Sequence, residues 1–169
     1  MAIVEGWTGR YLEDFTVGDV YRHGLGRTIT DVDNAWFTML TLNTNQMHFN
    51  DHYAKQSSFG QLLVNSAFTV ALVTGMSVSD ISQNGMANLS WTDIQLPNPV
   101  FGGDTLYAES LVTDVRESKS RPNVGIVSVK TRGLNQRGEV VCSFKRSVMV
   151  YKRDAPQDKG LFPETNEPF

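Results

Sequence analysis

The stretch Asn65-Ser66-Ala67-Phe68-Thr69-Val70-Ala71-Leu72-Val73-Thr74-Gly75-Met76-Ser77-Val78 decides the fold. It begins with two residues that favour a helix N-cap, and it then stays apolar on nearly every side of a helix. A helix without a polar face has to be enclosed by other elements. The stretch falls well below the ~18–20 apolar residues that span a bilayer. It therefore predicts a long buried helix in the core.

Strand composition dominates the chain after this helix. Val, Tyr, Thr and Leu are frequent there, and parts of it alternate with a period of two. We expect strands at residues 87–96, 105–116, 124–134 and 140–151. Turn residues separate them, and consecutive strands joined by short turns predict an antiparallel meander. The predicted class is α+β, with an antiparallel sheet wrapped around one long buried helix, which is the hot-dog arrangement.

The chain ahead of the helix has less regular patterning. Residues 21–30 suggest a strand, and residues 31–40 suggest a short helix with Thr30 or Asp31 as its N-cap. Residues 43–51 are rich in Asn and predict an irregular loop, with another short helical piece near residues 52–56. Loops of this kind often carry functional residues.

Length and composition predict one domain without nucleic-acid or membrane contacts. The chain has 169 residues and a net charge of -3 without a basic cluster. Its first ten residues contain neither a basic nor an apolar segment typical of a signal peptide. The one cysteine, Cys142, cannot form an intrachain disulfide, so we expect a cytoplasmic protein. The expected division is an arm at 1–10, the domain at 11–152 and a tail at 153–169.

Three histidines, His23, His48 and His52, are the first candidates for acid-base chemistry. His48 lies in the irregular loop and is the best candidate, because imidazole titrates near neutral pH. His23 and His52 are interpreted as structural. A metal site made of His48, Asp51 and His52 lacks a recognised ligand pattern, and Cys142 is expected to pack as a small hydrophobic residue. We therefore expect neither a metal nor another cofactor.

The start of the apolar helix is the second candidate site. Free backbone N–H groups around Asn65, Ser66 and Ala67, at the positive end of the helix dipole, could bind a developing oxyanion. An ordinary capped helix would need the same residues, so both interpretations stay open.

A family resemblance joins these two candidate sites. Residues 43–48, Asn-Thr-Asn-Gln-Met-His, followed by residues 59–66, resemble the hydratase motif of MaoC-like (R)-enoyl-CoA hydratases. In that family an Asp and a His stand five positions apart ahead of the central helix. The resemblance runs from about Tyr11 to Lys152. The chain is most similar to mesaconyl-CoA hydratases, also called β-methylmalyl-CoA dehydratases, in residues 42–44, 79–84, 87–89, 103–106 and 131–136.

This chain departs from the family motif at a catalytic position. Asn43 stands at the position of the family's catalytic Asp, and an amide can orient water but cannot accept its proton. Three hypotheses follow. His48 acts alone, Asp31 or Asp51 supplies the missing carboxylate, or the protein binds an acyl-CoA without turnover. We favour the first. Mesaconyl-CoA, the substrate that the resemblance implies, carries its own carboxylate, and a fixed Asp within ~4 Å of that carboxylate would repel it by ~1–4 kcal/mol.

The resemblance implies a lyase that reversibly hydrates a branched or carboxylated 2-enoyl-CoA. His48 would activate water, Asn43 would position it, and an N–H near Ser66 would polarise the thioester carbonyl. The alternatives are a non-catalytic acyl-CoA-binding protein of the nodulation (NodN-like) type and a hot-dog thioesterase. No metal or redox cofactor is implied.

The expected partners are an acyl-CoA substrate and a second copy of the chain. A single sheet around one helix leaves open edges, so a homodimer is the minimum expected assembly. Three basic residues, Arg121, Lys145 and Arg146, are interpreted as surface charges rather than ligands of the CoA phosphates.

Overall fold

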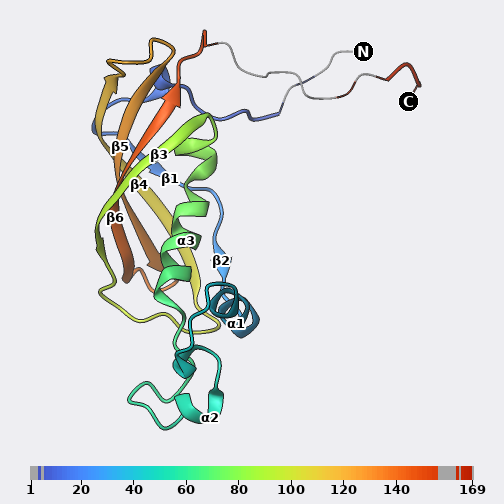
Figure 1. Ribbon diagram of the computed structural model, residues 1–169, viewed down its shortest axis with the longest axis vertical. Coiled ribbons are helices and arrows are strands. Elements are labelled where there is room, and N and C mark those ends of the chain that lie inside the picture. The colour runs from blue at the N-terminus through green and yellow to red at the C-terminus, as the bar shows by residue number, and fades with distance from the viewer. Residues whose placement is uncertain (1–3, 5, 156–162, 164, 169) are drawn as a thin grey trace.

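The computed structural model describes residues 4, 6–155, 163 and 165–168, and these residues form an antiparallel sheet that curves along a central helix (Figure 1). The sheet contains β1 (Val20–Arg22), β2 (Arg27–Thr28), β3 (Gly85–Gln95), β4 (Thr105–Glu117), β5 (Val124–Asn135) and β6 (Val140–Tyr151). The helical elements are η1 (Leu12–Asp14), α1 (Asp31–Leu40), η2 (Gln46–His48), α2 (Asp51–Ala54), α3 (Ser66–Met76) and η3 (Val78–Ser82). The predicted α+β class is confirmed.

The strand order differs from the predicted meander. The sheet runs β1-β4-β5-β6-β3, and β2 also pairs with β4. β4, β5 and β6 do form a meander, but β3 pairs with β6 at the far edge instead of with β4. Pro97 and Pro99 follow β3, and proline lacks the N–H that a hairpin ladder would need. The chain therefore crosses to β4 instead of forming a hairpin.

The predicted strand at residues 21–30 is also interrupted. It becomes the two short strands β1 and β2, separated by residues 23–26. Gly26 lies so close to the ring of Tyr107 that an added Cβ would collide with it. A larger residue at this point would have to displace the Tyr107 ring, a constraint that a pattern of strand residues does not reveal.

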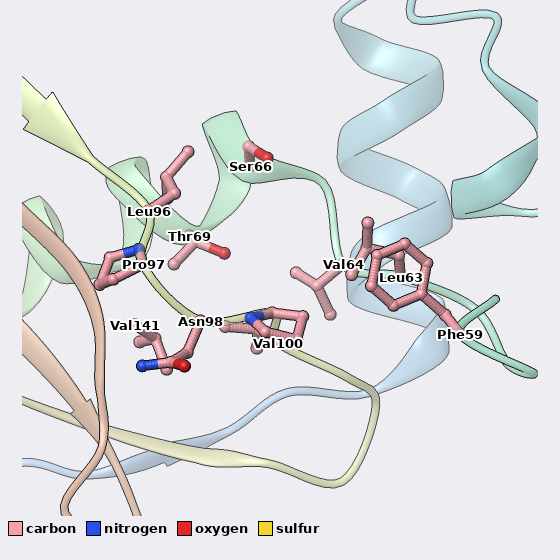
Figure 2. Close-up of a pocket in the computed structure, with 11 residues that line it drawn as sticks. Phe59, Leu63, Val64, Ser66, Thr69, Leu96, Pro97, Asn98, Val100 and Val141 are labelled. Carbon is pink, nitrogen blue, oxygen red and sulfur yellow. The ribbon is translucent and has the colours of Figure 1, made fainter.

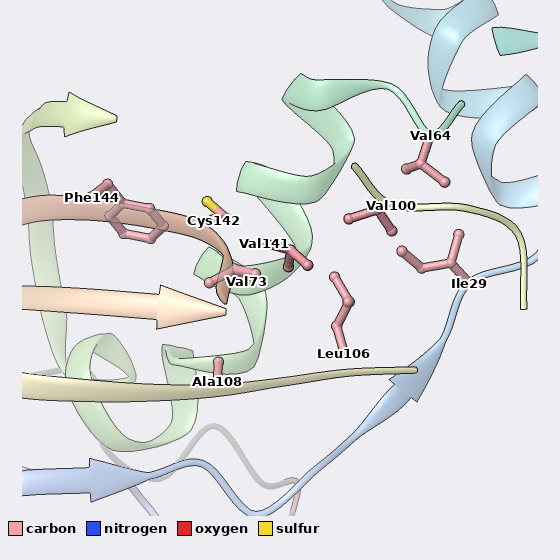
Figure 3. Close-up of a cluster of buried hydrophobic side chains, with 9 residues drawn as sticks. All are labelled: Ile29, Val64, Val73, Val100, Leu106, Ala108, Val141, Cys142 and Phe144. Atoms are coloured by element: carbon pink, nitrogen blue, oxygen red, sulfur yellow. The ribbon is translucent and has the colours of Figure 1, made fainter. Parts of the chain in front are cut away.

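Nine buried residues form the core between α3 and the sheet (Figure 3). They are Ile29, Val64, Val73, Val100, Leu106, Ala108, Val141, Cys142 and Phe144. Gly133 of β5 lets the helix approach closely, because a Cβ there would meet the side chain of Val73. Cys142 is fully buried in this cluster, so the prediction that it packs as a small hydrophobic residue is confirmed. Burial also raises the pKa of its thiol to about 11.

The sheet covers only one side of α3 within a single chain. Thr69 and Val73 are buried against the sheet. Ala67, Ala71 and Gly75, spaced four residues apart, are exposed on the other side. The enclosure expected from the apolar sequence is therefore complete on the sheet side only.

Arg146 is not a surface charge, and that interpretation was wrong. It lies on the inner side of β6, is 1% exposed, and donates from one terminal nitrogen to Ser77 Oγ at 3.0 Å. Burial lowers the pKa of its guanidinium to about 10. Ser77 is the C-cap of α3, so the cation sits at the negative end of the helix dipole.

Near the two ends of the chain, the described residues pack against the domain. Trp7 Nε1 donates to the carbonyl oxygen of Ser79 at 3.1 Å, and Arg153 pairs with Asp14. Most of the predicted tail at 153–169 lies outside the described residues. Within the described part of the chain, no helix is long and apolar enough to cross a membrane.

Candidate active site

The site is built around α1, whose buried face is polar. Thr30 caps the helix, as predicted: its hydroxyl accepts from the N–H of Asp33 at 3.2 Å. Asn34 and Thr38, one turn apart, are the buried residues of the helix, whereas Trp36 is 68% exposed. Buried polar side chains need hydrogen-bond partners, and those of Asn34 and Thr38 lie on the segments that carry the candidate site.

The Asn-rich loop after α1 is an ordered series of tight turns. Leu42 has φ 55°, a left-handed conformation that reverses the chain after the helix. The side chain of Asn43 accepts from the N–H of Asn45 at 2.9 Å, and that of Asn45 accepts from the N–H of Met47 at 3.1 Å. Asparagine favours such turns because its short amide can replace a backbone acceptor. The loop leads directly into η2, which ends at His48.

His48 is held by its Nδ1 atom. The ring is buried, with the residue 8% exposed, and Nδ1 lies 2.8 Å from the carbonyl oxygen of Leu63. A carbonyl only accepts hydrogen bonds, so Nδ1 carries the proton in this contact. The neutral imidazole then has its lone pair on Nε2, which has no hydrogen-bond partner among the described residues. His48 is thus oriented to accept a proton at Nε2.

The start of α3 offers one free N–H among the three predicted oxyanion residues. Asn65 is the N-cap, and its side chain accepts from the N–H of Ala67 at 3.0 Å. The N–H of Asn65 itself donates to Asn34 Oδ1 at 2.8 Å. Of these three residues, Ser66 is the one whose N–H has no hydrogen-bond partner among the described residues. Of the three residues predicted to bind an oxyanion, Ser66 therefore remains as the one with an available N–H.

A pocket of about 240 Å³ opens beside Ser66 (Figure 2). Ser66 and Thr69 of α3 form one wall, and the crossing segment after β3 passes in front of them. Phe59 and Leu63 lie at the end of the pocket away from Leu96 and Pro97. The carbonyl of Leu63 is the group that holds His48. The remaining lining residues are Val64, Leu96, Pro97, Asn98, Pro99, Val100 and Val141. This mostly apolar pocket suits a short acyl chain, and Ser66 is the predicted site residue in its wall, whereas His48 and Asn43 are not among its lining residues.

Asn34 connects these parts, and the sequence analysis missed it. Its Nδ2 donates to the carbonyl oxygens of His48 at 2.9 Å and of Leu63 at 3.0 Å. Thr38 accepts from Asn65 Nδ2 at 3.2 Å. A possible signal was present in the sequence: Asn34 and Thr38 are four residues apart in a helix whose other residues are mainly apolar or acidic.

Neither proposed substitute carboxylate reaches His48. Asp51 pairs with Lys55 at 2.6 Å on the exposed side of α2, and Asp31 lies beside Gly102. His52 is exposed and contacts Gln56 at 3.2 Å. Within the described residues, no group of three or more His, Cys, Asp or Glu side chains could hold a metal ion.

A second polar group has the order of a catalytic triad but lies in the core. His23 Nδ1 is 2.8 Å from Asp80 Oδ2, and Nε2 is 2.9 Å from Ser110 Oγ. Ser110 is 0% exposed, so no substrate can reach its hydroxyl. The three side chains join η3 to the sheet, which agrees with the structural role expected of His23.

Solved structures share this architecture. A MaoC-like dehydratase from Rhodospirillum rubrum superposes with a TM-score of 0.76 at 30% identity, covering 87% of this chain and 100% of that one. A structure from Chloroflexus aurantiacus, described as a MaoC domain protein dehydratase, superposes with a TM-score of 0.84 at 32% identity over 96% of this chain and 46% of that one. Fold and site together define a MaoC-like hot-dog protein.

The sequence comparisons narrow the class. A family model described as mesaconyl-CoA hydratase matches residues 5–167, and the chain belongs to this family. A mesaconyl-CoA hydratase from Cereibacter sphaeroides is 38% identical over 158 residues, which are 92% of this chain and 46% of that protein. The predicted family is confirmed. The chain spans about half the length of the curated relatives it matches.

Proposed function

We propose that the protein reversibly adds water to a 2-enoyl-CoA thioester, with mesaconyl-CoA as the substrate. The observation that carries this proposal is the contact of His48 Nδ1 with Leu63, which leaves Nε2 free as a general base. The Cereibacter sphaeroides relative is a mesaconyl-CoA hydratase by name, which supports the choice of substrate. The proposed class is a carbon-oxygen lyase that needs no cofactor besides its CoA-linked substrate.

In the proposed mechanism, the acyl chain lies in the pocket and its thioester oxygen accepts from the N–H of Ser66. Nε2 of His48 removes a proton from a water molecule while the water oxygen bonds to Cβ. Negative charge moves to the thioester oxygen, where the Ser66 N–H and the dipole of α3 stabilise it. The proton on Nε2 then transfers to Cα on the same face. Dehydration follows the same steps in reverse.

Asn43 has the donor that this water needs. Its Oδ1 already accepts from the N–H of Asn45, whereas its Nδ2 makes no hydrogen bond among the described residues and has both hydrogens left for a ligand. We infer that Nδ2 donates to the water oxygen, which leaves the protons of the water for His48. A neutral amide here also spares a substrate carboxylate the ~1–4 kcal/mol repulsion that an Asp would cause at ~4 Å. Mesaconyl-CoA carries such a carboxylate, whereas crotonyl-CoA does not.

The proposed assembly is a homodimer or a higher oligomer in the cytoplasm. β3 is a free sheet edge in the described structure, and its Leu89, Trp91 and Ile94 are exposed. A second copy could pair with this edge and cover the exposed side of α3.

The test is the loss of enoyl-thioester absorbance when the protein is mixed with mesaconyl-CoA and, separately, with crotonyl-CoA. We expect turnover of mesaconyl-CoA in preference to crotonyl-CoA. His48→Ala should lower the rate about 10²–10⁴-fold, the usual contribution of a general base. His52→Ala is the matched control, because it removes an exposed histidine from the same region, and it should stay within about twofold of wild type.

Three results would count against the proposal. Equal losses in His48→Ala and His52→Ala would remove His48 from the mechanism. Faster turnover of crotonyl-CoA than of mesaconyl-CoA would contradict the role given to Asn43. If wild-type protein bound mesaconyl-CoA by calorimetry without any loss of absorbance, the alternative of a non-catalytic acyl-CoA-binding protein would replace it.

A further inference from the structure

The side-chain amide of Asn34 makes three hydrogen bonds to the backbone: it donates two from Nδ2 and accepts one at Oδ1. Asn34 is 1% exposed, and its two Nδ2 hydrogens go to the carbonyl oxygens of His48 and Leu63 at 2.9 and 3.0 Å. Its Oδ1 accepts from the N–H of Asn65 at 2.8 Å. One side chain thus joins η2, the segment before α3 and the N-cap of α3.

Two of these bonds bear on the orientation of the His48 ring. The carbonyl oxygen of Leu63 accepts from Asn34 Nδ2 and also from His48 Nδ1, the latter at 2.8 Å. A carbonyl oxygen has two lone pairs, so both contacts can be satisfied together. Asn34 fixes the acceptor, and the acceptor fixes which nitrogen of His48 carries the proton. The backbone of His48 is held by the same amide through its carbonyl.

The third bond ties the start of α3 to the same amide that holds the backbone of His48. The N–H of Asn65 donates to Asn34, and Ser66 with its free N–H follows immediately in the chain. Thr38, one turn further along α1, holds the side chain of Asn65, and its carbonyl accepts from the N–H of Asn43 at 3.0 Å. One helix face therefore holds all the segments that carry the proposed chemistry.

We propose that Asn34 is the positioning residue of this site: it fixes the Nδ1-protonated form of His48 and the place of that ring relative to the N–H of Ser66. Asn34 need not touch the substrate. The role in turnover depends on the proposed hydration, whereas the effect on His48 does not. A misplacement of reacting groups by about 1 Å can cost about 10²-fold in rate.

The protein offers a matched control for a purely structural role. Asn135, at the end of β5, is also a buried asparagine with three side-chain hydrogen bonds. Its Nδ2 donates to Glu139 at 2.7 Å, and its Oδ1 accepts from the N–H groups of Arg137 and Glu139 at 3.0 and 3.1 Å. These bonds close the β5–β6 turn and do not involve His48.

The experiment compares Asn34→Ala, Asn34→Ser and Asn135→Ala by steady-state kinetics and by ¹⁵N NMR of the histidine rings, with His48→Ala to assign the signals. We expect Asn34→Ala to lower kcat about 10–100-fold with KM within about threefold of wild type. Asn34→Ser keeps a donor and an acceptor and should recover part of the loss. The wild-type spectrum should show His48 protonated on Nδ1, and only the Asn34 variants should shift that signal towards the other tautomer.

Two outcomes would overturn the proposal. One is a wild-type His48 signal and an undiminished kcat in Asn34→Ala. The other is an equal loss of kcat and an equal shift of the His48 signal in Asn135→Ala. If no acyl-CoA were turned over by wild type, the proposed hydration would fail, and the His48 signal would still decide whether Asn34 sets the tautomer. Should Asn34→Ala not fold, Asn34→Ser gives the same two measurements.

Discussion

The two helices α1 and α3 differ in which side chains they bury: α3 packs apolar side chains into the core, whereas α1 buries polar ones. α3 is apolar almost throughout and packs Val73 into the core. α1 buries Asn34 and Thr38 and exposes Trp36. Hydrophobicity explains the position of α3, but hydrogen bonds to neighbouring segments explain the position of α1. The difference shows that the scaffold next to the candidate site is held by polar contacts, whose loss is costly when they are buried.

The largest expected effect tests this difference directly on α1. Asn34→Leu makes the buried face of the helix more apolar, yet it leaves the carbonyl of His48 and the N–H of Asn65 without their partner. Each unsatisfied buried group costs about 1–3 kcal/mol, so we expect the free energy of unfolding to fall by roughly 2–5 kcal/mol. Urea denaturation of the variant and of wild type measures the difference.

Trp36→Gln is the matched change on the exposed side of the same helix. It removes a much larger apolar side chain, and it should change the free energy of unfolding of the isolated chain by no more than about 0.5 kcal/mol. If Trp36→Gln were the more costly substitution, burial of apolar surface would hold α1 in place, and α1 and α3 would not differ in what stabilises them.

The sequence predicted the sheet and α3 because both depend on local composition and period. The four long strands and the N-cap of α3 follow from β-branched residues, turn residues and an apolar stretch. Pairing of β3 with β6 could not be predicted in this way, because strand order depends on where the crossing segment after β3 leads. The inner position of Arg146 was missed for a related reason: its environment is supplied by Ser77, far away in the sequence.

For the candidate site, the sequence indicated His48 and the start of α3 but not what connects them. The motif around Asn43 and His48 pointed to the loop, and the capping residues pointed to Ser66. Asn34 was not singled out, since its three partners lie 14, 29 and 31 residues away along the chain. Such contacts become visible only when the segments are placed in space.

The second prediction concerns the exposed stripe of α3, which consists of Ala67, Ala71 and Gly75 and which the sheet does not cover. Ala71→Glu adds a charge in the middle of this stripe. If a second copy covers α3, desolvating that charge should weaken self-association at least about tenfold, as measured by light scattering on a dilution series. Leu40→Glu, on the exposed apolar side of α1, is the control and should leave the association unchanged. The reverse result would place the interface on α1.

The smallest expected effect concerns the start of α1. A hydrogen bond from Arg27, together with those from the backbone and side chain of Thr30, lowers the pKa of Asp33 from 3.8 to about 2. Because the pKa is lower in the folded protein, the stabilisation is complete well above pH 4 and is lost as the pH falls towards 2. Asp33→Asn should cost about 1 kcal/mol at pH 7, mainly through the capping box.

The pH dependence separates this contribution from a general effect of removing a charge. The difference in unfolding free energy between wild type and Asp33→Asn should shrink between pH 5 and pH 3, because protonation removes the same interaction from wild type. Asp51→Asn, which removes an exposed ion pair with Lys55, should cost less than about 0.5 kcal/mol. A gap that stayed constant from pH 5 to pH 3 would mean that the charge of Asp33 does not hold α1. The cap by the Thr30 hydroxyl and the polar bonds of Asn34 and Thr38 would then fix the helix without help from that charge.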